Sequence, residues 1–417
     1  MSLFSPKPRF RIYTSPSLYL SIFRDVILGR ANKGEDCLRI EEDVRKRFQI
    51  PYSLCTPQAR MGIYLAIKAL VKPGQRVLLS PYTIADVINM VICAGAEPVF
   101  VDIDSTSCNI NLREIEKLID SNTGAIMVTH LHGLACQMNS FTEICKKHNL
   151  FLIEDAAQSF GAKFNGKMVG SFGDVGIYSF GMYKNITAFF GGMVVTTHQE
   201  IYEKIHSEIN SFPYTEVGHF LKKVATGFAT GIATSPPLFQ LLVYHIFRFG
   251  HLYNVKAINR FVETELDLNR KDSIPEAYLR RMTPMQARLI LLGINKVEED
   301  NAIRIRYAQT YHEGLSDLSE LILPPLRTDG SHIYTYYPIQ FYDRDSLIRW
   351  MMKHYRDVGK QHLKNCADLP SFKKYYRECP NARKTADEVI LLPTYPSYTE
   401  KEVKRNIKTI RAFFGKR

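Results

Sequence analysis

The segment "LFLIEDAAQSFGAKFNGKMVGSFGDVGIYSFGMYKNITAFFGGMVVT", residues 150–196, decides the fold class. Its first six residues and the later "VGIYSF" (175–180) are apolar runs without polar alternation, which is typical of strands buried on both faces. Similar runs precede them: "RVLLS" (76–80), "PVFVDI" (98–103) and "GAIMVTH" (124–130). Between these runs, apolar residues recur at helical spacing in "ADVINMVICAG", "NLREIEKLID" and "NSFTEICKKH". The alternation predicts an α/β fold with a mostly parallel sheet covered by helices on both faces.

The amino-acid composition limits the classes of protein to which this chain can belong. The chain has 417 residues, of which 45% are hydrophobic and 23% are charged, as in an ordinary globular protein with room for two or three domains. The eight cysteines are scattered, without a CxxC pair or a Cys/His cluster, so neither a disulfide framework nor a metal site is expected. We therefore expect reduced thiols in a cytoplasmic protein, and the opening "MSLFSPKPRF" lacks the apolar centre of a secretory signal.

The net charge of +12 suggests a partner or substrate that carries negative charge. Nucleic acid, an anionic membrane surface and anionic small substrates would each fit this charge. Lysine and arginine are spread along the chain, and no arginine–aromatic nucleic-acid motif occurs. We therefore expect no nucleic-acid partner.

A second α/β unit begins near residue 321. Strand-like and helical stretches alternate there in "LILPP", "SHIYTYYPIQFYD", "DSLIRWMMKHYRDVG" and "VILLPTYPSYTEKEVKRNIKTIRAFF". The chain then divides into an N-terminal segment (1–50), a large domain (51–216 and 263–320), an insertion (217–262) and a small C-terminal domain (321–417).

A single lysine, Lys184, stands in the apolar, glycine-closed stretch "SFGMYKNITAFFGG" (179–192) directly after a predicted strand. Burying a lysine costs desolvation free energy unless its amine is paired, neutral or used in chemistry. Two interpretations are open from this stretch alone. Lys184 is either a strand-end residue that reaches solvent along its stem, or a pocket lysine that forms an imine.

Other polar groups are expected at the same edge of the sheet, because ligands bind beyond the carboxyl ends of parallel strands. Asp155 ends one strand of the segment and Ser179 ends another. "SLCTPQARMGIYLAIKAL" places Gln58, Ala59 and Arg60 at the start of a helix. Each residue also has a structural interpretation of its own, as a helix cap, a strand-end hydroxyl or a solvated helix residue.

An acid, a hydroxyl, a lysine and a helix N-terminus together match the needs of pyridoxal 5'-phosphate. This cofactor takes a carboxylate at its ring nitrogen and an amine that forms the imine. Its phosphate takes hydrogen-bond donors, which a helix N-terminus supplies. The order and spacing of the groups favour this cofactor over unrelated structural roles.

The stretch "IEDAAQSFGAKFNGKMVGSFGDVGIYSFGMYKNITAFFGGMVVT" (153–196) closely resembles the central block of the DegT–StrS aminotransferases, the sugar-nucleotide branch of fold-type I pyridoxal phosphate enzymes. The resemblance runs from about Gly29 to the C-terminus, weakens in the small domain, and includes "GAEPVFVDID", "THLHG" and "LLP". It implies the fold-type I architecture: a seven-stranded, mostly parallel sheet flanked by helices, with a smaller C-terminal α/β domain.

The resemblance implies roles for the residues at the strand ends. Lys184 would form the Schiff base and move the proton, and Asp155 would hold the pyridine nitrogen. Gln158 would bond the ring hydroxyl and Ser179 the phosphate. Asn185, which follows the lysine, would help to position its loop.

The chain departs from the family at the phosphate and at the ring. Where the family has Ser-Gly-Thr, this chain has Gln58, Ala59 and Arg60. Backbone donors survive the change and a guanidinium could bind phosphate bidentately, so Ala59 and Arg60 remain phosphate candidates. The aromatic residue that stacks on the ring falls at Ile84, and either Ile84 or the nearby Tyr82 could pack there.

The resemblance says less about contacts with the substrate and with a partner subunit than about the cofactor site. The asparagine that the family contributes across the dimer falls at Leu279, so the adjacent Arg280 is a candidate for that contact. His130, in "THLHG", is a second candidate for contact with substrate or with the other subunit.

The insertion is not explained by the resemblance. Residues 217–262 contain no Asp or Glu but include Lys222, Lys223, Arg248, Lys256 and Arg260. Ser-Pro-Pro divides the uncharged run 224–247 into halves too short for a bilayer, which takes roughly 20 apolar residues. Two interpretations are open: a helical hairpin packed on its own core or on a dimer mate, and an interfacial element on the inner face of a membrane.

The resemblance implies a homodimeric aminotransferase. Glutamate would donate the amino group and leave pyridoxamine 5'-phosphate, and a keto sugar, nucleotide-linked or lipid-linked, would accept it in cell-surface polysaccharide or glycolipid biosynthesis. Two alternatives use the same fold: a sugar dehydratase, in which histidine replaces the imine lysine, and a non-catalytic regulator or membrane scaffold. The retained Lys184 argues against the dehydratase, and the intact set of site residues argues against the scaffold.

Overall fold

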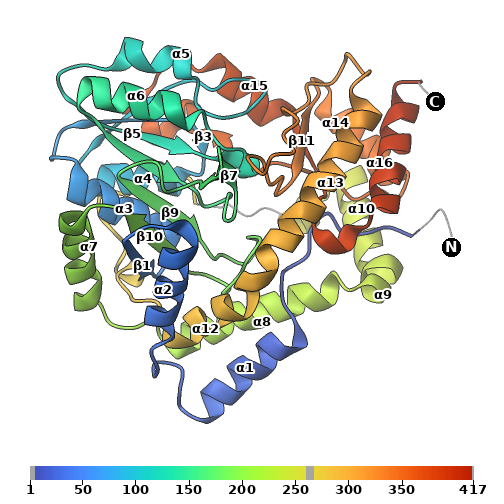
Figure 1. Ribbon diagram of the computed structural model, residues 1–417. Helices are drawn as coiled ribbons and strands as arrows, with labels where there is room; N and C mark the ends of the chain where they lie inside the picture. The colour runs from blue at the N-terminus through green and yellow to red at the C-terminus, as the bar shows by residue number, and fades with distance from the viewer. Residues whose placement is uncertain (1–4, 260–266, 416–417) are drawn as a thin grey trace.

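The computed structural model describes residues 5–259 and 267–415 (Figure 1). The ends of two predicted segments, 260–262 of the insertion and 263–266 of the large domain, lie outside these residues. The elements up to residue 211 are α1 (Pro16–Ile27), α2 (Asp36–Phe48), β1 (Tyr52–Thr56), α3 (Ala59–Leu70), β2 (Arg76–Leu79), β3 (Tyr82–Thr83), α4 (Ala85–Cys93), β4 (Glu97–Phe100), α5 (Leu112–Ile115), η1 (Glu116–Leu118), β5 (Thr123–Thr129), η2 (Leu131–Gly133), α6 (Met138–His148), β6 (Phe151–Asp155), β7 (Lys163–Phe164), β8 (Lys167–Met168), β9 (Val175–Ser179), β10 (Gly192–Thr196) and α7 (Gln199–Ser211). The later elements are α8 (Val217–Ala233), α9 (Pro236–Leu238), η3 (Phe239–Val243), α10 (Tyr244–Leu252), α11 (Lys256–Asn259), η5 (Glu276–Tyr278), α12 (Pro284–Gly293), η6 (Ile294–Lys296), α13 (Val297–Leu315), β11 (Tyr337–Gln340), α14 (Arg344–Lys353), β12 (Gly359–Lys360), β13 (Lys364–Asn365), η7 (Cys366–Asp368), η8 (Pro370–Tyr375), α15 (Pro380–Glu388), β14 (Val389–Leu392), η9 (Pro396–Tyr398) and α16 (Glu400–Phe413).

The central sheet of the large domain has seven strands in the order β1-β10-β9-β6-β5-β2-β4. Strands β4, β2, β5, β6 and β9 run parallel, and β10 is antiparallel to its neighbours β9 and β1. The strands predicted from the apolar runs are all present, and the prediction of a seven-stranded, mostly parallel sheet is confirmed. Because β6 and β9 are neighbours, Asp155 and Ser179 end adjacent strands at the same edge.

Both faces of this sheet are buried, as predicted. On β5, Ala125 and Met127 belong to the apolar core that includes α3 and α4, whereas Ile126 and Val128 belong to the core formed with α5 and α6. Successive side chains of a strand point to opposite faces, so a strand covered by helices on both sides must be apolar at every position. This geometry explains why the strands lack polar alternation.

The small domain is built on the antiparallel sheet β11-β14-β12, with α14 and α16 packed against it. Its core also takes in Tyr307, Tyr311 and Leu318, from α13 and the residues that follow it. Helix α13 thus runs from the large domain into the small one (Figure 1), and the boundary expected near residue 321 stays a prediction.

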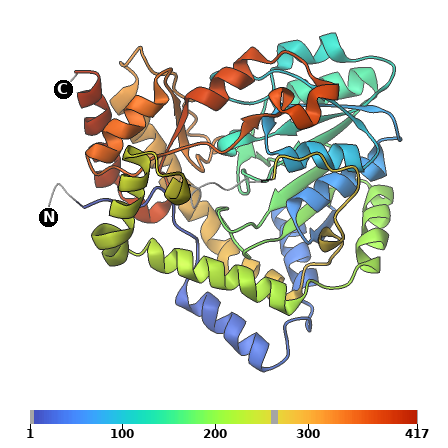
Figure 2. The same ribbon diagram turned by 180° about the vertical axis from the view of Figure 1, so that it is seen from behind.

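The insertion is not a hairpin closed on its own core. Phe220 and Val224 of α8 are buried with Phe189 in the large domain, whereas α10 packs on α14 of the small domain. The hydroxyl of Tyr244 donates to the carbonyl of Met352 at 2.6 Å, which fixes α10 there. The two halves lie against different domains (Figure 2), and the chain turns between them where the proline pair was expected to divide the run. No helix within residues 5–259 and 267–415 is long and apolar enough to cross a membrane.

The N-terminal segment packs against the small domain before it reaches α1. The backbone N–H and the guanidinium of Arg9 both donate to the carboxylate of Asp357, and Tyr395 donates its hydroxyl to the carbonyl of Pro8 at 2.8 Å. These contacts bring residues from the start of the chain to the mouth of the large cavity described below.

Gly176 in β9 allows the close approach of the loop before that strand. A Cβ at Gly176 would lie 1.8 Å from the carbonyl oxygen of Gly170, too close for any side chain. Gly176→Ala is therefore expected to lower the free energy of unfolding by about 4 kcal/mol or more, which would be measured as a large fall in melting temperature. Gly218→Ala in α8, where a Cβ meets open space, is the matched control and should leave the protein as stable or slightly more so. Equal melting temperatures for the two variants would contradict this packing.

Candidate active site

A cavity of about 710 Å³ opens at the carboxyl ends of β6 and β9, where the large and small domains meet. Eight of the ten site residues predicted from the sequence line it: Ala59, Arg60, Ile84, Asp155, Gln158, Ser179, Lys184 and Asn185. The tertiary structure therefore brings together residues from three separate parts of the chain.

Lys184 and Asp155 form the centre of the cavity. Burial lowers the pKa of the Lys184 amine, and the nearby Asp155 carboxylate opposes that shift. Burial also raises the pKa of Asp155. Two interactions oppose this shift: the Ala157 N–H donates to Oδ1 at 3.1 Å, and the charge of Lys184 lies nearby. Of the two interpretations of Lys184, the structure supports the pocket lysine.

The N-terminus of α3 opens into the cavity. The side chain of Gln58 makes no capping hydrogen bond, so the first backbone N–H groups of the helix, at Ala59 and Arg60, are donors without a side-chain cap. Gly192 allows β10 to pass beside them, because a Cβ there would lie 2.6 Å from the Ala59 nitrogen. A helix N-terminus of this kind is a ready binding site for a phosphate group.

The guanidinium of Arg60 has a partner inside the protein. It is paired with the carboxylate of Asp86, and the same nitrogen donates to the hydroxyl of Tyr278 at 3.0 Å. Lys271 also contacts Asp86, at 2.6 Å, so two cations share one carboxylate at this end of the cavity. The Arg60 guanidinium is thus engaged in an ion pair inside the protein, and the role of Arg60 at a phosphate stays a prediction, for which its backbone N–H is the free donor.

Three further residues are oriented by hydrogen bonds to the backbone. The side-chain oxygen of Gln158 accepts from the His132 N–H at 3.0 Å, which leaves the amide NH₂ to donate. The hydroxyl oxygen of Ser179 accepts from an N–H at 3.3 Å and keeps its own proton for a ligand. Asn185 donates to the carbonyl of Phe160 at 2.8 Å and thereby holds the loop that carries the lysine.

Ile84 occupies the place where the family has an aromatic residue. It lines the cavity, whereas the alternative, Tyr82, is buried behind it, 1% exposed. The cofactor ring would therefore meet an aliphatic side chain on this side.

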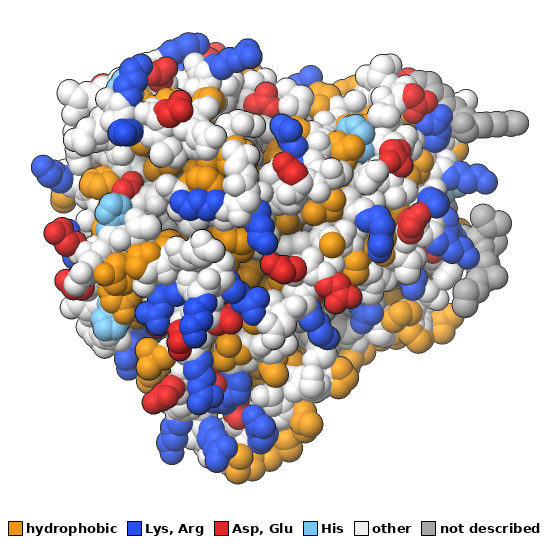
Figure 3. Space-filling model, viewed as in Figure 1, with side chains coloured by type: hydrophobic (Ala, Val, Ile, Leu, Met, Phe, Trp, Pro, Cys, Tyr) orange, Lys and Arg blue, Asp and Glu red, His pale blue; other side chains and the backbone are white. Residues whose placement is uncertain are grey.

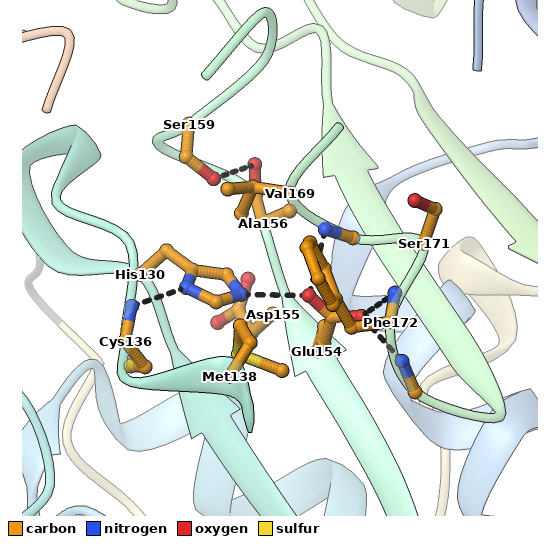
Figure 4. A network of polar contacts seen from close by, with 12 residues as sticks. His130, Cys136, Met138, Glu154, Asp155, Ala156, Ser159, Val169, Ser171 and Phe172 are labelled. Atoms are coloured by element: carbon orange, nitrogen blue, oxygen red, sulfur yellow. Dashed lines mark hydrogen bonds and ion pairs between the residues drawn. The ribbon is translucent and has the colours of Figure 1, made fainter. Parts of the chain in front are cut away.

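His130 is a structural residue, which corrects its prediction as a contact with substrate or with the other subunit. It is fully buried, and its Nε2 lies 3.1 Å from the carboxylate of Glu154 (Figure 4). Its Nδ1 accepts from the Cys136 N–H at 3.1 Å, so Nε2 carries the proton and donates to Glu154. With both ring nitrogens bonded inside the protein, His130 has nothing to offer a ligand.

Arg280 lies outside the cavity of its own subunit. Its guanidinium donates to the carbonyl of Leu279 at 3.0 Å and lies 3.8 Å from the carboxylate of Glu216. Its role across a dimer interface stays a prediction.

One wall of the cavity, supplied by the N-terminal segment and the small domain, was not predicted from the sequence. The residues in question are Arg9, Phe10, Tyr336, Lys360 and His362. Burial, aided by the nearby Lys184, lowers the pKa of His362 to about 4, so the imidazole is neutral near pH 7. No local pattern marks these residues, since only the packing of the two domains brings them to the cavity.

The residues present fit pyridoxal 5'-phosphate. The helix N-terminus and the Ser179 hydroxyl offer donors for a phosphate, Asp155 offers a buried carboxylate, and Lys184 offers an amine whose pKa burial lowers. Gln158 has an unused NH₂ on the same wall. This donor set is the one that the phosphate, ring nitrogen, aldehyde and ring hydroxyl of the cofactor require.

Comparison with known proteins identifies the family. The DegT/DnrJ/EryC1/StrS aminotransferase family model matches residues 25–229 and 250–411. The chain belongs to this family. Its members are sugar aminotransferases of the fold-type I class, which use pyridoxal 5'-phosphate. The stretch left unmatched, residues 230–249, falls within the insertion.

Individual relatives agree with this assignment. The protein MJ1066 of Methanocaldococcus jannaschii is 28% identical over 389 residues, which cover 89% of this chain and 88% of that protein. GDP-perosamine synthase of Escherichia coli O157:H7 is 35% identical over 175 residues, which cover 42% of this chain and 48% of the synthase. The aminotransferase from Psychrobacter cryohalolentis shares the fold, with a TM-score of 0.77 and 23% identity over 99% of both chains.

The lowered pKa of Lys184 has a measurable consequence. In the protein stripped of cofactor, the amine is expected to lose its proton at a lower pH than the ordinary value of 10.5, because burial disfavours the charged form. Its acylation rate should therefore rise with pH and level off below pH 10.5, as measured by mass spectrometry after brief labelling. The exposed Lys360, on the same cavity, serves as the reference for access of the reagent. A rate for Lys184 that still climbs above pH 10.5 would contradict the burial argument.

Proposed function

We propose that this protein transfers an amino group from glutamate to a nucleotide-linked keto sugar, with pyridoxal 5'-phosphate bound at Lys184. The observation that carries the proposal is the placement of Lys184 and Asp155 in one cavity with the open N-terminus of α3. Two relatives support the sugar acceptor: the GDP-perosamine synthase above, and the spore coat polysaccharide biosynthesis protein SpsC of Bacillus subtilis, 25% identical over 394 residues. The product would then enter polysaccharide or glycolipid biosynthesis.

Each residue of the cavity has its own part in the proposed reaction. Pyridoxal 5'-phosphate, when bound, supplies an electron-accepting ring that stabilises negative charge on the substrate carbon. Asp155 keeps the ring nitrogen protonated, and the α3 N-terminus and Ser179 hold the phosphate. The amine of Lys184 removes the proton from one carbon and returns it to another, for which a lowered pKa is suited. Arg9 and residues of the small domain complete the wall of the cavity.

We infer that the protein acts in the cytoplasm as a homodimer, with Arg280 reaching the cavity of the other subunit. Contact of residues 217–262 with the inner face of a membrane would bring a lipid-linked acceptor, or a membrane enzyme that consumes the product, within reach of the same cavity.

Lys184→Ala tests the chemistry directly. The variant is expected to lose the visible absorbance of the lysine-bound cofactor and to lower kcat by about a thousandfold or more, because both the imine and the proton carrier are removed. Spectra would be recorded before and after glutamate is added, and turnover measured with nucleotide-linked keto sugars. Lys360→Ala, which removes another lysine from the same cavity, is the control and should keep the absorbance. A Lys184→Ala variant with unchanged turnover would rule out the proposal.

The homodimer and the role of Arg280 are tested by mixing subunits. If Arg280 serves the neighbouring site, both Lys184→Ala and Arg280→Ala homodimers should be impaired. Mixed dimers would contain one site with both native residues, so refolding the two variants together should restore part of the activity. A monomeric protein, or a mixture no more active than its components, would contradict the cross-subunit contact.

A further inference from the structure

Helix α10 is apolar on both of its sides. Tyr244 and Gly250 are buried, which fixes the inner face. The outer face carries a stripe at spacings of four, three and four residues, one helical face: Leu242, Ile246, Phe249 and Tyr253. Leu241, just before this stripe, is 81% exposed, and Tyr253 is 70% exposed. A surface helix normally presents polar residues to water, so this outer face is built for another environment.

Helix α1 repeats the pattern, although no local sequence pattern connects it with the insertion. Leu18 and Ile22 bury its inner face against the large domain. Leu20, Phe23 and Ile27, spaced three and four residues apart, point outward and are between 64% and 67% exposed. The helix thus presents a second apolar face to the outside.

Helix α8 contacts α1 and leads along the chain to α10. The ring of Tyr19 in α1 packs edge-on against Phe228 in α8, with centroids 5.2 Å apart. From there α8 runs along the edge of the molecule to α9, and α10 follows (Figures 1 and 2). Hydrophobic side chains gather along this edge beneath α1 and on the flank near α9 (Figure 3). We call the exposed side chains of α1, α8, η3 and α10 the basal surface.

The charge of the basal surface has one sign. Residues 217–259 contain no carboxylate, and the single acid of α1, Asp25, is 1% exposed and paired with Arg288. The flanking acids in sequence lie outside these helices: Glu35 after α1, Glu216 directly before α8, with its side chain 74% exposed, and Glu263 after residue 259. The basic residues are exposed and flank the apolar faces: Arg24, Arg30, Lys222, Lys223 and Lys256.

We propose that the basal surface docks on the anionic face of a lipid bilayer. Its apolar side chains would enter the boundary between headgroups and acyl chains, about 5–10 Å deep, while the lysines and arginines meet the headgroups. Phe249 and Tyr253, whose rings lie 4.7 Å apart, suit the headgroup level, where aromatic residues concentrate. A surface that packs on protein has no reason to lack carboxylates. A surface that meets anionic lipid has such a reason, because carboxylates would be repelled by the headgroups.

Vesicle binding of the full-length holoenzyme tests the proposal independently of transamination. Sedimentation with phosphatidylcholine vesicles, with and without phosphatidylglycerol, is expected to show binding only when the anionic lipid is present. The pair Leu242→Ser and Phe249→Ser, and the pair Phe23→Ser and Ile27→Ser, should each weaken binding about tenfold or more. Lys222→Gln with Lys223→Gln should weaken it about fivefold per charge, and added salt should do the same.

The matched control removes exposed apolar side chains elsewhere. Tyr342 and Tyr376 are 79% and 55% exposed and belong to none of the elements of the basal surface, so Tyr342→Ser with Tyr376→Ser should bind vesicles like the wild type. Melting temperatures would confirm that all variants fold. As a second measurement, Phe249→Trp should show a blue shift of fluorescence on anionic vesicles.

Three outcomes would overturn the proposal. The first is wild-type protein that binds neither kind of vesicle. The second is a set of basal variants that bind as tightly as the control. The third is a change of oligomeric state in the basal variants without a change in vesicle binding, which would assign the basal surface to a second copy of this chain.

Discussion

The site depends on one carboxylate and one amine, those of Asp155 and Lys184, that line the same cavity. Asp155 ends β6 and Lys184 lies on the loop that follows β9, and these strands are neighbours in a parallel register. Burial shifts both pKa values toward the neutral forms, and the attraction between the two groups opposes each shift. A carboxylate and an amine with such shifted pKa values suit a ligand that binds both groups. The cofactor of this family binds a carboxylate through its ring nitrogen and an amine through its aldehyde.

The strand that carries Asp155 also anchors the surrounding loop. Side chains alternate along β6, so Glu154 points away from the cavity and accepts hydrogen bonds from the N–H groups of Gly170, Phe172 and Gly173 at 2.6–2.7 Å. His130 supplies a further donor to the same carboxylate. A charged group accepting several hydrogen bonds is tolerated in a core and fixes the backbone that binds it. Of two neighbouring acids on one strand, Asp155 thus lines the cavity and Glu154 holds the loop on the other face.

Two parts of the chain are added around this shared core. The N-terminal segment crosses the small domain and brings Arg9 to the cavity, and the insertion lays α8 and α10 along the outside. The family match stops at residue 229, within α8, and resumes at 250, within α10, so the unmatched stretch is the connection 230–249 between these two helices. Their burial against two different domains also means that α8 and α10 are held in place by the core and leave their outer faces to another partner.

The sequence by itself determined the fold class and the chemical centre. Both are written in local patterns: continuous apolar strands, helical periodicity, and polar residues placed where strands end. Lys184, Asp155 and Ser179 could be singled out in this way because each stands at or just after the end of a strand, whereas Gln158 followed from the family resemblance. Only the tertiary structure decided the rest. His130 was expected to contact a ligand, but it is hydrogen-bonded to Glu154 inside the core. Arg60 forms an ion pair with Asp86. Arg9 and His362 line the cavity although they come from distant segments of the chain. The physical reason is that a side chain's partners depend on which elements pack together, and such contacts join residues hundreds of positions apart that no local pattern connects.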